Sequence, residues 1–128
     1  MPYGAFLTVV RERGGYTPDE AERITEAVLT ALGTRLTADV AGHLADQLPE
    51  PMADMLNDAV ATPQDWGVRE FLTRIAETTG DDLESAEAHT RTVLSTLAEQ
   101  ISGGERNKVL SRLPSGYADL FGFPELAG

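Results

Sequence analysis

Residues 17–32 have the sequence TPDEAERITEAVLTAL, and this stretch decides the fold. It opens as a helix start, because Thr17 can cap, Pro18 suits the first helical position and Glu20 completes a capping box. The apolar residues that follow are three and four positions apart, which is the spacing of one helix face. They are Ala21, Ile24, Ala27, Val28, Ala31 and Leu32. The stretch therefore predicts a central core helix.

The same pattern returns in the second half of the chain. Aligning Phe6 with Phe71 superposes residues 6–56 on residues 71–121 without a gap, and 15 of the 51 aligned pairs are identical. A fixed period of this kind is typical of a duplicated unit. The identical pairs include residues 6–8 with 71–73, 28–29 with 93–94, 48–49 with 113–114, and 53–54 with 118–119.

Each copy is predicted to hold four helices, because no segment shows the two-residue alternation of a strand. Glycines stop the first helix of each copy, and a Leu-Pro pair closes the third. Thr37 caps the third helix of the first copy, and Ser102-Gly103-Gly104-Glu105 is a second capping box. In the first copy the predicted helices cover about residues 5–13, 38–48 and 51–60, in addition to the one that starts at Thr17. In the second copy they cover about residues 68–78 and 116–121, in addition to those that start at Asp82 and Ser102.

These elements predict an all-α fold, a bundle of about eight helices built from two tandem four-helix repeats related by a pseudo-twofold axis. The chain is expected to form one domain over residues 1–128. One unit of roughly 55 to 60 residues buries too little surface for comfortable stability, so the copies should pack on each other. The predicted divisions are repeat one at about 5–60, a linker at 61–67, repeat two at about 68–121 and a loose tail at 122–128.

The charge balance excludes several classes of protein. Ten Lys and Arg stand against 21 Asp and Glu, a formal charge of -11. Neutralising the phosphates of nucleic acids or of anionic membranes needs clustered basic residues, and only Arg106, Lys108 and Arg112 come near such a cluster. We therefore expect no nucleic-acid partner and no membrane partner. The chain has no cysteine, which excludes thiolate metal sites and thiol nucleophiles.

The apolar stretch near the amino terminus is not typical of a targeting signal. Residues 6–10 are mostly apolar, but no basic residue precedes them and Arg11, Glu12 and Arg13 follow at once. A signal peptide or membrane span is not expected, and a cytoplasmic location is the default.

The two histidines stand at different places in the two copies. Asp39 and Asp46 flank His43 at helical spacing, which permits a metal half-site but fits a solvated helix face better. His89 aligns with an apolar core position of the first copy, so a partly buried, satisfied histidine is expected there. Residues 101–105 resemble the signature loop of ABC-type ATPases, but without a Walker A loop a helix cap is the better interpretation.

Acidic residues gather at helix starts, where carboxylates cap free amides. Asp54 and Asp119 are an aligned identical pair and fit either a solvated position or a symmetric polar contact between the copies. Four apolar residues could form a partner-binding spot, although packing under the linker and tail is more common. They are Trp66, Phe123, Met52 and Met55.

The repeated motifs resemble a bacterial family known as domain of unknown function 2267. The resemblance implies an all-helical, duplicated cytoplasmic protein, and it carries over no activity, cofactor or catalytic residue. The residues that carry it are 71–77, 93–97, 101–105, the segment from Leu113-Pro114 to Leu120-Phe121, and 41–49 in the first copy.

We therefore predict no catalytic, cofactor-binding or metal-ligating residue, no cofactor and no enzyme activity. The favoured hypothesis is a non-enzymatic module that binds a protein partner, or a second copy of itself, through a groove between its two repeats. The alternative is a small-molecule or metal site at the junction of the repeats, where Asp54, Asp119, His43 or His89 could meet.

Overall fold

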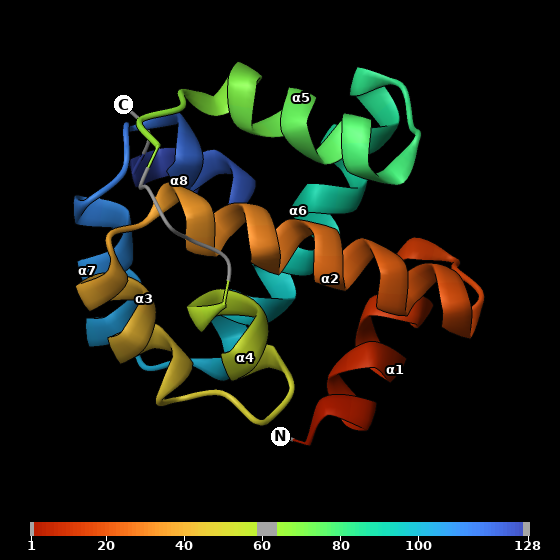
Figure 1. The fold of residues 1–128 in the computed structure, drawn as a ribbon, viewed down its shortest axis with the longest axis horizontal. Helices are drawn as coiled ribbons and strands as arrows, with labels where there is room; N and C mark the ends of the chain where they lie inside the picture. Colours follow the sequence, from red (N-terminus) through yellow and green to blue (C-terminus); the bar gives the residue numbers. More distant parts are fainter. Residues whose placement is uncertain (1, 59–63, 127–128) are drawn as a thin grey trace.

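A computed structural model describes residues 2–58 and 64–126, which form α-helices and one short 3-10 turn, with no strand among them (Figure 1). The predicted all-α class is confirmed. The helices are α1 (Tyr3–Gly14), α2 (Pro18–Arg35), α3 (Ala38–Ala45), α4 (Met52–Asn57), α5 (Val68–Thr79), α6 (Leu83–Gln100), α7 (Gly103–Ser111) and α8 (Gly116–Leu120), and the turn is Pro124–Leu126.

The helices of the two halves begin and end in matching places. In the alignment of the two copies, both ends of α1 coincide with those of α5, and both ends of α2 coincide with those of α6. The long helices α2 and α6 contact each other; α1 contacts α2 and α6, while α5 contacts α6 and α2. Each first helix thus packs on the long helix of the other half as well as on its own. The pseudo-twofold relation of the halves in space stays a prediction.

The predicted start of α2 is confirmed as a reciprocal capping box. The Glu20 backbone N–H donates to Thr17 Oγ1 at 3.2 Å, and the Thr17 N–H donates to Glu20 Oε1 at 2.9 Å. These bonds lower the pKa of the Glu20 carboxyl. In the second half, Asp82 caps α6 by accepting from the Ser85 N–H at 2.7 Å. Both long helices therefore start where the sequence places them.

The second predicted capping box is only half correct. Ser102 Oγ accepts from the Glu105 N–H at 3.0 Å, but the Glu105 carboxylate does not return the bond. Instead Gln47 Oε1 accepts from the Ser102 N–H at 3.1 Å, and Gln47 Nε2 donates to Glu105 Oε1 at 3.3 Å. Because Gln47 comes from the first half, this cap connects the segment after α3 to α7 across the repeat junction.

Several predicted ends need correction. Helix α3 stops at Ala45 and not at Leu48, because Gln47 and Leu48 donate to carbonyls only three residues back. Helix α4 ends at Asn57, and the predicted residues 59 and 60 lie outside the described part, as do residues 61–63 of the predicted linker. The sequence predicts a loose tail, but the tail forms a turn over 124–126, and the Arg106 guanidinium lies 4.4 Å from the centre of the Phe123 ring.

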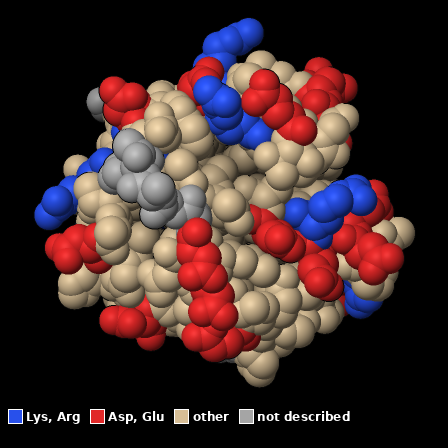
Figure 2. All heavy atoms as spheres, in the orientation of Figure 1, with Lys and Arg blue, Asp and Glu red and all other residues tan. Residues whose placement is uncertain are grey.

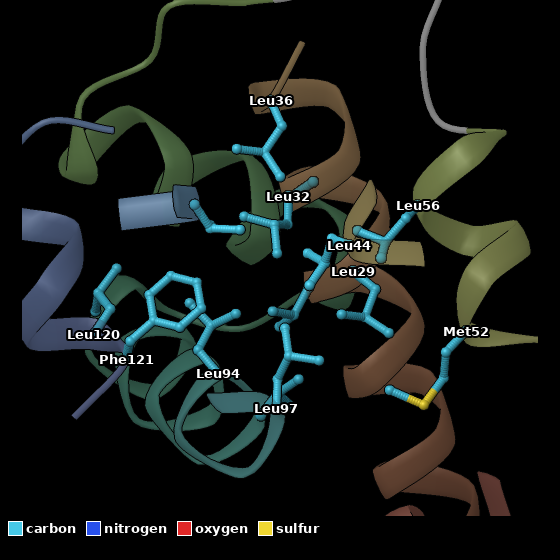
Figure 3. Packing of buried hydrophobic residues seen from close by; sticks show 14 of the residues in the cluster. Leu29, Leu32, Leu36, Leu44, Met52, Leu56, Leu94, Leu97, Leu120 and Phe121 are labelled. Carbon is cyan, nitrogen blue, oxygen red and sulfur yellow. The ribbon is translucent and has the colours of Figure 1, made fainter. Parts of the chain in front are cut away.

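One hydrophobic cluster holds both halves together. Leu29 and Leu32 of α2 lie beside Leu94 and Leu97 of α6, all fully buried (Figure 3). Tyr117 of α8 is also fully buried in the same cluster. Burial of this apolar surface is the main stabilising contribution to the fold, and it comes from both repeats.

Candidate functional site

A groove of about 590 Å³ runs between α2 and α5, where the first half meets the second. One wall is the exposed side of α2, and the other is formed by α5 and the segment before it. The small side chains of Ala27 and Ala31 lie low in the groove, 6% and 9% exposed. The remaining lining residues are Arg23, Glu26, Thr30, Thr34, Trp66, Arg74, Glu77 and Thr78.

Trp66 is held at the end of this groove by its backbone. Arg35 Nε donates to the Trp66 carbonyl at 2.7 Å, and the Tyr117 hydroxyl donates to the same oxygen at 2.8 Å. Burial raises the pKa of Tyr117 to about 12, which keeps the hydroxyl protonated as a donor. Two residues earlier, the Gln64 N–H donates to the Thr34 carbonyl at 3.1 Å. These bonds hold the Trp66 backbone, and its half-buried indole packs against the hydrophobic cluster.

The charges on the groove walls are balanced, with two arginines and two glutamates. Arg74 is already paired, because its guanidinium contacts Glu70 at 3.0 Å and Glu77 at 3.9 Å and lies 5.5 Å from the Trp66 ring centre. Arg23 and Glu26 on α2 make no hydrogen bond or ion pair with any described residue. The α2 wall thus presents one unpaired charge of each sign.

The corresponding contact on the other side of the molecule is closed by an arginine. Arg13 of α1 reaches α6, where Nη1 donates to Thr96 Oγ1 at 3.1 Å and to Glu99 Oε2 at 2.7 Å, and Nη2 donates to Glu99 Oε1 at 2.9 Å. This bidentate contact lowers the pKa of the Glu99 carboxyl. The guanidinium spans the space between α1 and α6.

Short side chains replace this arrangement in the α2–α5 groove. The alignment of the copies places Thr78 where α1 has Arg13, and Thr34 where α6 has Glu99. Neither threonine can span the distance that an arginine and a glutamate cover together. Both threonines line the open groove, while the helices on either side have matching bounds.

A second groove of about 410 Å³ lies on the other flank of α2, against α4. Its lining carries Glu22, Glu26, Asp54 and Asp58 and no Lys or Arg. Figure 2 shows the contrast on this face: acidic groups alone lie over α4, and both signs of charge lie over α2 and α5.

Two groups beside these acids, Glu50 and Tyr3, have raised pKa values. A hydrogen bond with Asp54, together with partial desolvation and the charges of Asp54 and Asp58, raises the pKa of Glu50. The Tyr3 hydroxyl in the same groove is buried without a hydrogen-bond partner, and burial raises its pKa to about 12.

An ion pair stands at the corresponding place beside α6. In the alignment of the copies, Glu26 corresponds to Arg91 and Asp54 to Asp119. Arg91 Nη2 donates to Asp119 Oδ2 at 2.6 Å, which lowers the pKa of the Asp119 carboxyl. Asp119 therefore bonds within its own half, and Asp54 is exposed among other acids. The interpretation of this pair as a symmetric contact between the copies has no bond to support it in the described part of the chain.

The histidines remain apart from each other. His43 is exposed on α3 beside Asp39 and Asp46, as a solvated helix face predicts. His89 is half-buried, and its Nδ1 lies 2.9 Å from Asp81 Oδ2, as expected for a satisfied histidine. Among residues 2–58 and 64–126, no three His, Asp or Glu side chains are grouped so that they could hold a metal ion.

The predicted apolar spot is not a single patch. Trp66, Phe123 and Met55 are half-buried, and Met52 is fully buried, which agrees with the favoured prediction of packing and not with a surface spot that includes Met52. Of these four residues only Trp66 lines the α2–α5 groove.

The four candidates for a site at the repeat junction do not meet there either. No bond within the described ranges joins any two of Asp54, Asp119, His43 and His89. Each lies on a different helix, and Asp119 and His89 already have partners of their own.

Sequence reasoning missed the polar residues of the groove, above all Arg23 and Glu26. A signal was present in the aligned copies, because positions that carry arginine in one copy carry a short or acidic residue in the other. Such mismatches mark aligned positions at which the surfaces beside α2 and α6 differ.

A family model described as "Uncharacterized conserved protein (DUF2267)" matches residues 3–120, nearly the whole of the chain. The chain belongs to the DUF2267 family. The resemblance inferred from the repeated motifs is thus confirmed, and the match covers all eight helices that the structure describes in this DUF2267 protein. No curated protein matches the chain. None of the described helices combines the length and the apolar character needed to cross a membrane.

Proposed function

We propose that this chain is a non-enzymatic protein-interaction module that binds through the groove between α2 and α5. The observation that carries the proposal is the open groove of about 590 Å³ with a tryptophan on its wall whose backbone is held by two hydrogen bonds. Tryptophan is enriched among the residues that contribute most to protein–protein binding. We also propose the cytoplasmic location that is expected from the sequence.

The floor of the groove favours an elongated occupant. The lining residues of α2 run from Arg23 to Thr34, a length of about 16 Å at the helical rise of about 1.5 Å per residue. The alanines between them allow a partner backbone or side chain to approach closely. A segment of a partner protein fits this shape better than a compact ligand does.

A small molecule in the same groove is the alternative. A volume of about 590 Å³ lies within the range of about 300–1,000 Å³ that is usual for ligand pockets. The guanidinium groups of Arg23 and Arg74 would suit an anionic ligand beside the Trp66 ring. A metal ion is not part of this alternative, because the charged groups of the groove include two arginines.

Site-specific photo-crosslinking in the native cell tests the proposal. A benzophenone amino acid at Thr30, which is exposed on the groove wall, should give discrete adducts with a protein. The same group at His43, exposed on α3 outside the groove, is the control. Equal labelling at both positions, or no adduct at Thr30, would contradict the proposal. Quenching of Trp66, the single tryptophan, by extracted metabolites without any protein adduct would favour the alternative.

A further inference from the structure

We propose that the occupant of the α2–α5 groove is a second copy of this chain, bound in a symmetric dimer in which the two α2 helices run antiparallel. This inference deepens the proposed interaction function and rests on it. Arg23 of each copy then faces Glu26 of the other.

The exposed side of α2 has the shape that a self-complementary interface needs. Glu26 and Thr30 line both the α2–α5 groove and the α2–α4 groove, so they form a ridge between two hollows. Helices pack by inserting the ridges of one into the grooves of another. In a twofold dimer the same patch serves both partners, and it must therefore offer a ridge and a groove at once. On α2, Glu26 of the ridge and Arg23 at the end of the groove lie about one turn apart, so Glu26 of one copy meets the Arg23 end of the groove in the other.

The net charge decides which of the two grooves a second copy can enter. Two copies with a formal charge of -11 each repel one another unless they meet at a place where the local charge is balanced. The α2–α4 groove carries acids alone, so a second acidic copy is repelled there. The α2–α5 groove carries two arginines and two glutamates. It is the flank of α2 at which like molecules can approach.

The charges of Arg23 and Glu26 determine how the two α2 helices align in the dimer. Arg23 and Glu26 are three positions apart in the helix, hence about one turn apart on the same side. An antiparallel α2 from a second copy presents the same two charges in the opposite order. The dimer then contains two reciprocal ion pairs, and both groups that have no ion-pair partner within residues 2–58 and 64–126 gain one.

A charge-swap series followed by analytical ultracentrifugation tests this arrangement. The wild-type chain should show concentration-dependent dimer formation. The Arg23→Glu and Glu26→Arg variants should each dimerise roughly tenfold more weakly or worse, because each places like charges opposite each other twice. Arg112→Glu, which makes the same charge change at an exposed site just after α7, is the matched control and should dimerise like the wild type. Circular dichroism confirms that every variant is folded.

The decisive sample is an equimolar mixture of Arg23→Glu and Glu26→Arg. Neither variant pairs well with itself, but the mixture restores both opposite-charge contacts, so a heterodimer of near wild-type affinity should form. The double variant Arg23→Glu/Glu26→Arg should dimerise with itself for the same reason.

Two results would overturn the second copy as the occupant. One is a wild-type chain that stays monomeric up to about 1 mM, a concentration at which even weak specific dimers form. The other is a mixture that forms no heterodimer. If a monomeric wild-type chain still gives adducts at Thr30 with a different protein, the dimer is wrong and the interaction function stands. If those adducts are absent as well, both are wrong.

Discussion

Helices α2 and α6 occupy corresponding places in the two halves, yet their flanks differ. Beside α6, Arg13 reaches across to Glu99, and Arg91 reaches across to Asp119. Beside α2, the corresponding positions hold short or acidic side chains, and a groove lies on each side of the helix. One long helix is connected to its neighbours by arginines, and the other is left accessible.

The two long helices differ at their surface and agree in the core. Core positions such as Leu29 and Leu94 are identical and fully buried, since a packed interior tolerates little change in volume. Surface positions such as Thr78 and Arg13 are under no such constraint. A few substitutions at the rim of a shared framework can thus turn a closed helix contact into an open groove without altering the helices.

Substitutions of aligned core leucines on α2 and α6 should change the free energy of unfolding most. Leu29→Ala and Leu94→Ala should each lower the free energy of unfolding by about 2–5 kcal/mol, because each leaves a cavity in the core. Since the halves share one cluster, each variant should shift a single transition in urea monitored by circular dichroism. Two separate transitions in either variant would show that the halves unfold independently.

Two buried threonine hydroxyls without a hydrogen-bond partner should each cost the fold about 1 kcal/mol. The hydroxyls of Thr25 and Thr90, which stand at aligned positions of the two copies, are buried without a hydrogen-bond partner. Thr25→Val and Thr90→Val should therefore each raise the free energy of unfolding by about 1 kcal/mol. The matched variant Thr96→Val should instead lower the free energy of unfolding, because Thr96 Oγ1 donates to the Thr92 carbonyl at 2.8 Å and accepts from Arg13. Thermal melting measures all three, and stabilisation by Thr96→Val would contradict the account.

The acids beside the two helices should respond to pH in opposite directions. The pKa of Glu99 is lowered by Arg13, so its contribution to stability is present above about pH 4.5 and is lost as the pH falls through its folded value. Glu99→Gln should be slightly less stable than the wild type at pH 7, by well under about 1 kcal/mol because the pair is exposed. This difference should shrink as the pH falls below about 4.5.

Glu50, just before α4, is the opposite case. The pKa of Glu50 is raised in the folded chain, so protonated Glu50 favours folding at a pH below its unfolded pKa of about 4.5. This stabilisation is lost as the pH rises through the folded pKa. Glu50→Gln should consequently be more stable than the wild type at pH 7, and the gain should disappear below about pH 4.5. Urea titrations at pH 3, 5 and 7 check both variants, and parallel pH profiles for the two would contradict the assignment of these acids.

Local patterns in the sequence are enough to predict most of the fold. The capping box at Thr17, the cap at Asp82 and the period of the core residues depend on near neighbours in the chain, and the structure confirms them. The prediction for the Ser102 cap is half wrong because its partner, Gln47, is 55 residues away. The predicted end of α3 is too late because the change to a tighter last turn leaves little trace in the apolar pattern.

Local sequence patterns do not predict the groove, because residues far apart in the sequence form it. Its walls come from α2 and α5, and only their packing brings Arg23 and Trp66 to one surface. The sequence predicts a groove between the repeats but not which helices form it. The aligned copies contain the missing clue, namely an arginine at position 13 with a threonine at position 78.

If the open flank of α2 is an association surface, an ion pair that fills the α2–α5 groove should prevent association. The double variant Thr34→Glu/Thr78→Arg reproduces in the α2–α5 groove the pair that Arg13 and Glu99 form beside α6. Analytical ultracentrifugation should find this variant folded and monomeric at concentrations where the wild type dimerises. A folded variant that dimerises as well as the wild type would contradict the account.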